Sequence, residues 1–387
     1  MRVKLGEVCD INPKIQVTDD HVEVSFVPMQ NVSEDGIIYL SETRLYGEVK
    51  KGFTSFHNGD VLFAKITPCM ENGKGGIVKN LKNGLGFGST EFHVLRPHSD
   101  IVLSDWLYYL TSWPVFRKEC EKNMTGSAGQ KRVPKSFLEE YKLFLPPLET
   151  QRHIAAVLDK VSALIALRRQ QLDKLDELVK ARFVEMFGDP VKSTRWRMRK
   201  LSQMGELNRG VSKHRPRNDP ALLGGRYPLI QTGDVANAGL LISSFSSTYS
   251  ELGLKQSRMW QAGTLCITIA ANIAKTAILS FDACFPDSIV GFIPSEKISV
   301  VFIHYWFSFF QKILEEQAPQ VAQKNINLQI LSNLDVIVPP ADLQNQFAAF
   351  VTQTEKTKAA VQQALEKLET LKKALMQEYF GKQDVGF

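Results

Sequence analysis

Residues 143–152 read LFLPPLETQR, and residues 336–345 read VIVPPADLQN. In both stretches a short run typical of a β-strand ends in two prolines, and a long segment rich in Ala, Leu, Lys, Glu and Gln follows. Proline cannot donate the next backbone hydrogen bond of a strand, and it keeps the residue before it out of the helical conformation. The pattern therefore predicts a strand-to-helix junction that occurs twice in the chain.

The two junctions belong to an internal repeat. Residues 130–188 align with residues 323–381 at a constant offset of 193 without a gap, and 19 of the 59 positions are identical. Outside this stretch the halves agree more loosely, as in residues 59–67 and 263–271. The sequence thus predicts a duplicated unit of roughly 190 residues, too long for a solenoid repeat. Coincidental similarity is the alternative.

Each long segment carries apolar residues at alternating spacings of four and three. This pattern lasts for more than four heptads and predicts two helices that bury each other as a coiled coil. Gly188 and Gly381 are expected to end the helices in the left-handed conformation. Arg168, Arg182, Lys358 and Lys372 interrupt the seam and are expected either to face acidic groups of a partner or to reach water. The apolar seam positions are Ile154, Leu158, Val161, Ile165, Leu172, Leu175 and Val179 in the first helix, and Phe347, Val351, Val361, Leu365, Leu368 and Leu375 in the second.

The regions before the two helices differ from them in pattern, because short β-type runs alternate with Gly, Asn, Asp and Pro. A helix is expected at residues 104–122, with Ser104 as its N-cap and a break at Pro114. Its counterpart is expected at residues 300–317, and the glycine-rich residues 84–89 are expected to form a turn. The predicted fold class is α+β. It has β-rich globular domains at residues 1–148 and 189–341, joined by two long coiled-coil helices at residues 149–188 and 342–382 as an internal repeat.

The composition is that of an ordinary globular protein. The chain has 387 residues, of which 44% are hydrophobic and 23% charged, and this length exceeds the roughly 250–300 residues at which single cores stop growing. No apolar run is long enough to span a bilayer, and the first residues lack a secretory signal, so a cytoplasmic protein is expected. The five cysteines are widely spaced and form no C-x-x-C pair. They are expected to be reduced thiols rather than disulfides or zinc ligands.

The sequence contains no recognisable catalytic motif. It has neither a phosphate-binding P-loop nor a dinucleotide-binding glycine motif after a strand, and an amino-methyltransferase tetrad is also missing. Asp60 with Glu71 and Lys74 could imitate nuclease carboxylates, but this spacing is a frequent accident. His93, His153 and His304 have no nearby ligands at metal spacing and are expected to be structural or surface residues. We therefore predict a chain that is not an enzyme and holds no metal.

Basic, amide-rich segments are the main candidates for binding. The formal net charge is +6. Residues 192–217 hold nine Lys and Arg against one Glu, and residues 117–135 hold six basic residues against two acidic ones. Such segments suit the phosphates of a nucleic acid and the edges of its bases, since Arg or Lys pairs with guanine and Asn or Gln with adenine. The alternative is an ordinary solvated basic face.

These features together resemble the specificity subunit of type I restriction–modification systems. The resemblance is carried by LPPLETQRHIAAVLD at residues 145–159, by its altered copy VPPADLQNQFAAFV at residues 338–351, and by KARFVEMFGDP at residues 180–190. GDVLFAKITPCMENGKGG at residues 59–76 is similar to the strand and loop inside the target-recognition domains of that family. The likeness covers essentially the whole chain, including the order of its parts.

The resemblance implies a DNA-binding subunit without catalysis. Each globular domain would recognise one half of a bipartite, asymmetric double-stranded DNA site. The two helices would pack antiparallel, as a pseudo-two-fold repeat, and form the spacer between the domains. Two DNA methyltransferase subunits would dock on the helices, and two motor-nuclease subunits could join. S-adenosylmethionine, ATP and Mg²⁺ would belong to those partners. The residues alone leave two alternatives open: a coiled-coil adaptor that binds protein, and a self-sufficient DNA-modifying enzyme.

The resemblance also places DNA contacts in the loops of both domains. In the first domain the candidates are Gln30, Lys65, Thr67, Asn72, Lys74, Ser89, Thr90, Lys131 and Arg132. In the second domain they are Lys213, His214, Arg215, Arg217, Gln231, Thr232, Asn272, Lys275, Lys324 and Asn325.

Overall fold

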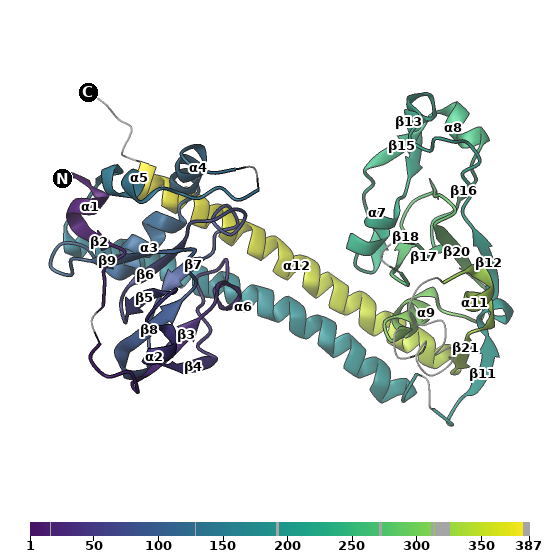
Figure 1. Cartoon of the computed structure of the whole chain (residues 1–387). Helices are drawn as coiled ribbons and strands as arrows, with labels where there is room; N and C mark the ends of the chain where they lie inside the picture. Colours follow the sequence, from purple (N-terminus) through teal and green to yellow (C-terminus); the bar gives the residue numbers. More distant parts are fainter. Residues whose placement is uncertain are drawn as a thin grey trace. The chain divides into compact units, whose positions relative to one another are not determined.

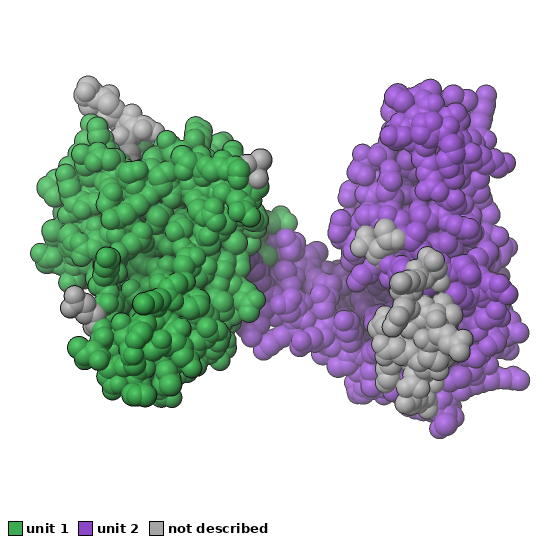
Figure 2. Space-filling view, viewed as in Figure 1, with its two compact units in different colours: residues 1–168, 364–387 green, residues 169–363 purple. Residues whose placement is uncertain are grey.

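The computed structural model describes residues 1–15, 17–127, 129–190, 193–270, 273–310, 313 and 326–381. It divides into two compact units, Met1–Arg168 with Ala364–Phe387, and Arg169–Gln363 (Figure 2). Each unit therefore combines one globular region with parts of both long helices. No helix in the described ranges is both long and apolar enough to cross a membrane.

Unit 1 contains two four-stranded sheets and a short two-stranded one (Figure 1). The first sheet has the order β2-β9-β6-β7 and the second β4-β3-β8-β5, in which β3 and β8 run parallel. Strand β1 pairs antiparallel with β10. The strands are β1 Arg2–Lys4, β2 Cys9–Ile11, β3 Glu23–Val27, β4 Glu42–Leu45, β5 Thr54–His57, β6 Val61–Ala64, β7 Gly75–Ile77, β8 Leu85–Gly88, β9 Phe92–Pro97 and β10 Lys142–Phe144. The helices before the long one are α1 Leu5–Val8, α2 Tyr46–Val49, α3 Ser104–Ser112, α4 Pro114–Lys122 and α5 Lys135–Glu140.

Unit 2 repeats this topology. Its sheets have the orders β12-β20-β17-β18-β14 and β15-β13-β19-β16, β13 again runs parallel to β19, and β11 pairs antiparallel with β21 as β1 does with β10. The strands are β11 Arg197–Lys200, β12 Gly205–Arg209, β13 Leu223–Leu229, β14 Leu241–Ile242, β15 Ser247–Tyr249, β16 Met259–Trp260, β17 Leu265–Thr268, β18 Thr276–Leu279, β19 Ala283–Cys284, β20 Ile289–Pro294 and β21 Asp335–Val338. The helices are α7 Thr232–Asn237, α8 Glu251–Lys255, α9 Val300–Phe307 and α11 Leu328–Asn333.

The two long helices are α6 Leu148–Phe187 and α12 Ala341–Phe380, each of 40 residues. In unit 1, Ile154 and Leu158 near the start of α6 share a core with Met376 and Phe380 at the end of α12. In unit 2 the opposite ends meet, because Phe183 packs edge-on against Phe347 at 5.5 Å between ring centroids. The helices are therefore antiparallel in each unit, and the predicted fold class is confirmed.

A buried glutamine explains why the junction sequence occurs twice. Gln151 lies one turn after Pro146-Pro147 and is fully buried. Its Oε1 accepts from Leu103 N at 2.9 Å, and its Nε2 donates to Ile101 O at 3.0 Å and Pro146 O at 2.8 Å. Gln344 does the same in unit 2 toward Ser299 N at 3.0 Å and Pro339 O at 2.8 Å. One side chain thus ties the hinge and the first turn of each long helix to the segment that precedes α3 or α9.

Three local predictions were wrong. Ser104 is the first residue of α3 rather than its N-cap, and its hydroxyl donates to Gly59 O at 2.7 Å. Gly381 does not take the left-handed conformation, although Gly188 does at φ +79°. Residues 84–89 contain the central strand β8, not only a turn. Its Gly86 and Gly88 leave room for neighbours, because a Cβ on Gly86 would lie 2.1 Å from the Phe56 ring.

The helix predicted at residues 104–122 does break at Pro114, which begins α4 after the extended Trp113. Its counterpart is interrupted, since α9 stops at Phe307, Ser308 and Phe309 form a turn, and Phe310 and Ile313 are helical again. The rest of the predicted range, residues 311–312 and 314–317, lies outside the described residues.

Candidate nucleic-acid interface

In unit 1 the nine predicted contact residues lie on four segments that backbone hydrogen bonds join together. Lys65 N donates to Glu91 O at 2.9 Å, and Thr67 N donates to Lys131 O at 3.0 Å. Ser89 N donates to Val27 O at 3.3 Å. Residues 27–31, 65–74, 89–91 and 129–133 therefore form one continuous group of loops, which we call loop group 1.

The nine side chains of loop group 1 fall into two classes. Gln30, Asn72, Thr90 and Lys131 are exposed, whereas the other five are half-buried. Three of the half-buried ones bind a different segment of loop group 1. The Lys74 ammonium donates to Met29 O at 3.1 Å, the Thr67 hydroxyl donates to Gly129 O at 3.2 Å, and Arg132 binds Glu91. These three hold the loops in place, while the exposed side chains are available to a ligand.

The ion pair between Arg132 and Glu91 closes loop group 1. The guanidinium donates to both carboxylate oxygens, at 2.9 and 2.8 Å. This hydrogen bonding holds the pKa of Glu91 below its ordinary value. The pair keeps one arginine from solvent anions and fixes the distance between residues 91 and 132.

Replacing Glu91 by glutamine is expected to raise DNA affinity, because the change removes an anion from loop group 1 and frees Arg132 for a phosphate. The increase should be about twofold to fivefold, since an ion pair that is only partly buried contributes little. The wild-type ion pair contributes stability at neutral pH that is lost as the pH falls below the ordinary pKa of a glutamate, and E91Q should lack that acid-dependent loss. Band shifts at pH 7.5 and thermal melts from pH 7 to pH 3.5 measure both effects; a weaker complex for E91Q would contradict the expectation.

Two buried residues beneath loop group 1 were not predicted as part of the site. His93 Nε2 donates to Val133 O at 2.8 Å and its Nδ1 lies 3.0 Å from Asn12 Nδ2, while burial lowers the His93 pKa. Arg117 Nη1 donates to Met70 O at 2.6 Å, and burial lowers the Arg117 pKa to about 10. Arg117 thus supports the 65–74 loop from below. The sequence held a signal for the burial of Arg117, which lies four residues after Trp113 and three before Cys120. Trp113 at the N-cap of α4 and Cys120 on α4 are both buried.

In unit 2 a basic loop follows β12 and carries Lys213, His214, Arg215 and Arg217, all exposed. Gln256 Oε1 accepts from the backbone N–H groups of Lys213 at 2.7 Å and His214 at 3.1 Å, which fixes the start of the loop. Asp287 pairs with both Arg215 and Arg217. A single carboxylate therefore positions two guanidinium groups side by side.

Arg217, Gln231 and Thr232 line one cavity of about 300 Å³. The structure thus brings together three of the predicted contacts of the second half. Lys275 lies elsewhere, beside Lys180 and His304 in a different cavity of about 400 Å³. Asn272, Lys324 and Asn325 lie outside the described residues. No group of three or more potential metal ligands occurs within the described ranges.

The predicted seam positions are buried to different degrees. Ile154, Leu158, Val161, Ile165, Val179, Phe347, Val351, Val361 and Leu365 are buried, and Leu172, Leu175, Leu368 and Leu375 are half-buried. Among the interruptions, Lys358 on α12 binds Asp176 on α6 at 2.7 Å and Glu355 at 3.0 Å. The Lys358 pKa is raised because these hydrogen bonds outweigh the effect of burial. This lysine faces an acid within its own chain.

Comparison with known proteins agrees with this architecture. A family model described as "Type I restriction modification DNA specificity domain" matches residues 1–177 and 194–370. The EcoAI specificity subunit of Escherichia coli is 46% identical over 175 residues, which cover 44% of this chain and 30% of the relative. The chain therefore matches less than a third of that relative's length. The putative MjaX specificity subunit of Methanocaldococcus jannaschii is 22% identical over 82% of this chain and 76% of its own length.

Solved structures support the fold. A chain from a structure titled for complex assembly and conformational transition of the type I R-M system has a TM-score of 0.60 at 18% identity, covering 98% of this chain and 96% of that one. The type I S subunit from M. genitalium has a TM-score of 0.52 at 13% identity, with the same coverage. From the family match over both halves, the chain belongs to the type I restriction–modification DNA specificity family.

Proposed function

We propose that the chain is the specificity subunit of a type I restriction–modification complex and reads a bipartite, asymmetric DNA site without catalysing a reaction. The observation that carries this proposal is the repeated topology with dissimilar loops. Both units share the order of their core strands, to which unit 2 adds β14, yet the equivalent loops after β2 and after β12 differ in sequence. Two readers with one scaffold and different contact residues suit two unlike half-sites. In this proposal residues 1–148 and 189–341 are the target-recognition domains, and residues 149–188 and 342–382 are the spacer.

The contact chemistry favours duplex DNA over an acidic protein. Loop group 1 presents amide and hydroxyl side chains beside lysine, through Gln30, Asn72, Thr90 and Lys131. Amides can bond adenine edges, while lysines suit guanine and phosphate. The basic loop of unit 2 adds exposed cationic groups that suit the phosphate backbone. All nineteen predicted DNA contacts remain proposals at the level of single residues.

Other subunits are proposed to supply the chemistry. Two methyltransferase subunits would dock on the helical spacer, and two motor-nuclease subunits could join them; S-adenosylmethionine, ATP and Mg²⁺ belong to those partners. Exposed leucines on the helices support docking there: Leu164, Leu167 and Leu178 on α6 and Leu371 on α12 are each 45–58% exposed. A docked partner would bury these side chains, as it does in apolar protein interfaces. The complex would act in the cytoplasm, where its DNA lies.

Sequencing the methylated bases of cells that express the chain with its methyltransferase partner tests the proposal. We expect methylation within a motif of two specified parts separated by an unspecified gap, with different sequences in the two parts. A motif without a gap would overturn the proposal. Methylation by the pure chain alone would indicate a self-sufficient enzyme. Negligible DNA affinity even at low salt, where phosphate contacts are strongest, would indicate a protein-binding adaptor.

A further inference from the structure

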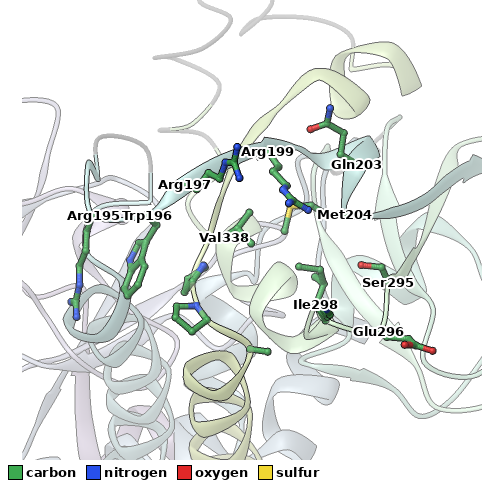
Figure 3. Close-up of a pocket in the computed structure, with 14 residues that line it drawn as sticks. Arg195, Trp196, Arg197, Arg199, Gln203, Met204, Ser295, Glu296, Ile298 and Val338 are labelled. Carbon is green, nitrogen blue, oxygen red and sulfur yellow. The ribbon is translucent and has the colours of Figure 1, made fainter.

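A cleft lies in unit 2 where β21 gives way to α12. Its volume is about 700 Å³, within the range of ligand-binding sites. Four segments line it: residues 195–199 with β11, residues 203–204, residues 295–298 after β20, and residues 338–341 with the second proline pair (Figure 3). The cleft uses the repeated hinge, and none of the nineteen residues proposed to contact DNA lines it.

Positive charge dominates the cleft. Arg195, Arg197, Arg199 and Lys297 line it against a single carboxylate, that of Glu296. Arg197 and Arg199 are exposed, and alternate positions of a strand place their side chains on the same face. No described carboxylate forms an ion pair with either guanidinium. By contrast, the next basic residue, Lys200, binds Asp335 at 2.8 Å.

The cleft also has an apolar wall. Val338 and Ile298 line it, together with the half-buried ring of Trp196. The indole Nε1 of Trp196 donates to Phe187 O at 2.7 Å, and the Arg195 guanidinium lies 4.5 Å from its ring centroid. The ring is therefore fixed in place. An occupant needs both anionic groups and an apolar side chain.

Duplex DNA is not the occupant that the geometry favours. Strands β12 and β20 pair antiparallel from Gly205 opposite Pro294 to Arg209 opposite Val290. The cleft lies at the Gly205 end, since Met204 and Ser295 line it, whereas the basic loop follows the Arg209 end. Five strand residues span roughly 17 Å at about 3.4 Å per residue. The cleft and the basic loop thus lie at opposite ends of one strand pair.

The charge is not a requirement of the repeated fold. Phe144 and Ile337 are equivalent positions of the repeat. Phe144 pairs with Arg2 in unit 1 and Ile337 pairs with Met198 in unit 2, so Arg2 corresponds to Met198. Met1 and Val3 therefore occupy the positions of Arg197 and Arg199. The first half builds the same β-pair without arginine at either position. The two arginines of β11 therefore serve something other than the stability of this hinge.

We propose that the cleft binds an acidic segment of a partner polypeptide, with Asp or Glu carboxylates on Arg197 and Arg199 and an apolar side chain against Trp196. The positive charge of the cleft suits acidic side chains, and its distance from the basic loop favours a protein over DNA as the occupant. The proposal rests on the proposed function in one respect: the partner is another subunit of the same complex. Because only the second half has the charge, the segment would bind once per chain.

The first test uses the full chain and a fluorescein-labelled octapeptide that contains five acidic residues, one leucine and one phenylalanine. We expect saturable binding by fluorescence anisotropy, a loss of tenfold or more in R197E/R199E, and no binding of the same peptide with lysines in place of its acids. The matched control is K213E/R215E, which reverses the same charge at the other end of β12 and should leave peptide binding unchanged. Equal losses in both variants, or no loss in R197E/R199E, would overturn the proposal. Thermal melts check that the variants fold.

The second test uses the assembled complex with a photo-crosslinking p-benzoylphenylalanine in place of Ser295, an exposed residue of the cleft. The expected crosslink is to a partner peptide rich in Asp and Glu, and R197E/R199E should reduce its yield. Crosslinks only to DNA, or to a neutral or basic peptide, would overturn the inference. DNA affinity of the wild-type chain is measured alongside. If the wild-type chain has no DNA affinity, the proposed function is refuted. If the wild-type chain binds DNA but R197E/R199E binds the acidic peptide as tightly as the wild type does, only the proposal for the cleft is refuted.

Discussion

Replacing Gln151 by leucine is expected to lower the free energy of unfolding by about 3 kcal/mol or more, since each buried polar group left without a partner costs about 1–3 kcal/mol. The change keeps an apolar stem of similar length but removes the bonds to Leu103 N, Ile101 O and Pro146 O. The Gln151 side chain that these three backbone groups bind is fully buried, so water cannot easily replace the lost hydrogen bonds. Urea unfolding followed by circular dichroism measures the loss.

Gln353→Leu is the matched control, because Gln353 is an exposed glutamine on α12. Its replacement should change stability by no more than about 0.5 kcal/mol, as for most surface substitutions. Gln344→Leu should be costly like Gln151→Leu, since it loses bonds to Ser299 N and Pro339 O. If Gln151→Leu and Gln353→Leu were equally harmless, the buried glutamine would not hold the junction.

The same glutamine shows how far sequence reasoning could go. The repeat revealed that Gln151 and Gln344 recur, and the proline pairs located the helix starts to within a few residues. The reason for the glutamine was not visible, because Leu103 and Ile101 precede it by 48 and 50 residues. Heptad spacing predicted the helices because the residues that contact the partner helix recur at a fixed period along the sequence. A single buried side chain has no such period.

The glycine-rich residues 84–89 show the opposite failure. Glycine is common in turns, and nothing local distinguishes a turn from a strand crowded by its neighbours. In the structure the Phe56 ring and the Val27 carbonyl occupy the space where the Cβ atoms of Gly86 and Gly88 would lie. The cause is thus tertiary. Long-range packing overrode the local preference at this position.

For the candidate interface the sequence indicated a set of loops. It did not indicate which side chains in them are buried or held in ion pairs. The resemblance to the family placed the predicted contacts in the segments that make up loop group 1. It could not show that Arg132 is held by Glu91, or that Arg117 lies buried beneath the 65–74 loop. In unit 2 it could not show that Asp287 pairs with Arg215 and Arg217. Such pairings join distant parts of the chain, and they decide which cationic groups remain available to a ligand.

Reversing the charge of the basic loop in K213E/R215E/R217E is expected to weaken DNA binding about 100-fold or more at low salt, because each lost phosphate contact also reinstates a counterion. The three side chains are exposed and lie on one loop after β12. Reversal also leaves Asp287 without its two arginine partners, so repulsion of phosphate is added to lost attraction. The slope of log K against log salt concentration should become shallower by about two to three units. Band shifts over a salt series measure both quantities.

The control with the same change in net charge is K356E/K367E/K373E, three exposed lysines of α12. If the loop contacts DNA directly, the helix variant should keep most of its affinity and its salt slope, because salt screens charges that do not contact the DNA. Equal weakening of both variants would mean that net charge rather than the loop governs binding. Unchanged binding in K213E/R215E/R217E would show that the basic loop does not contact DNA. Gln231 and Thr232, which line the cavity beside that loop, would then lack the neighbouring phosphate contacts that the proposed function assumes.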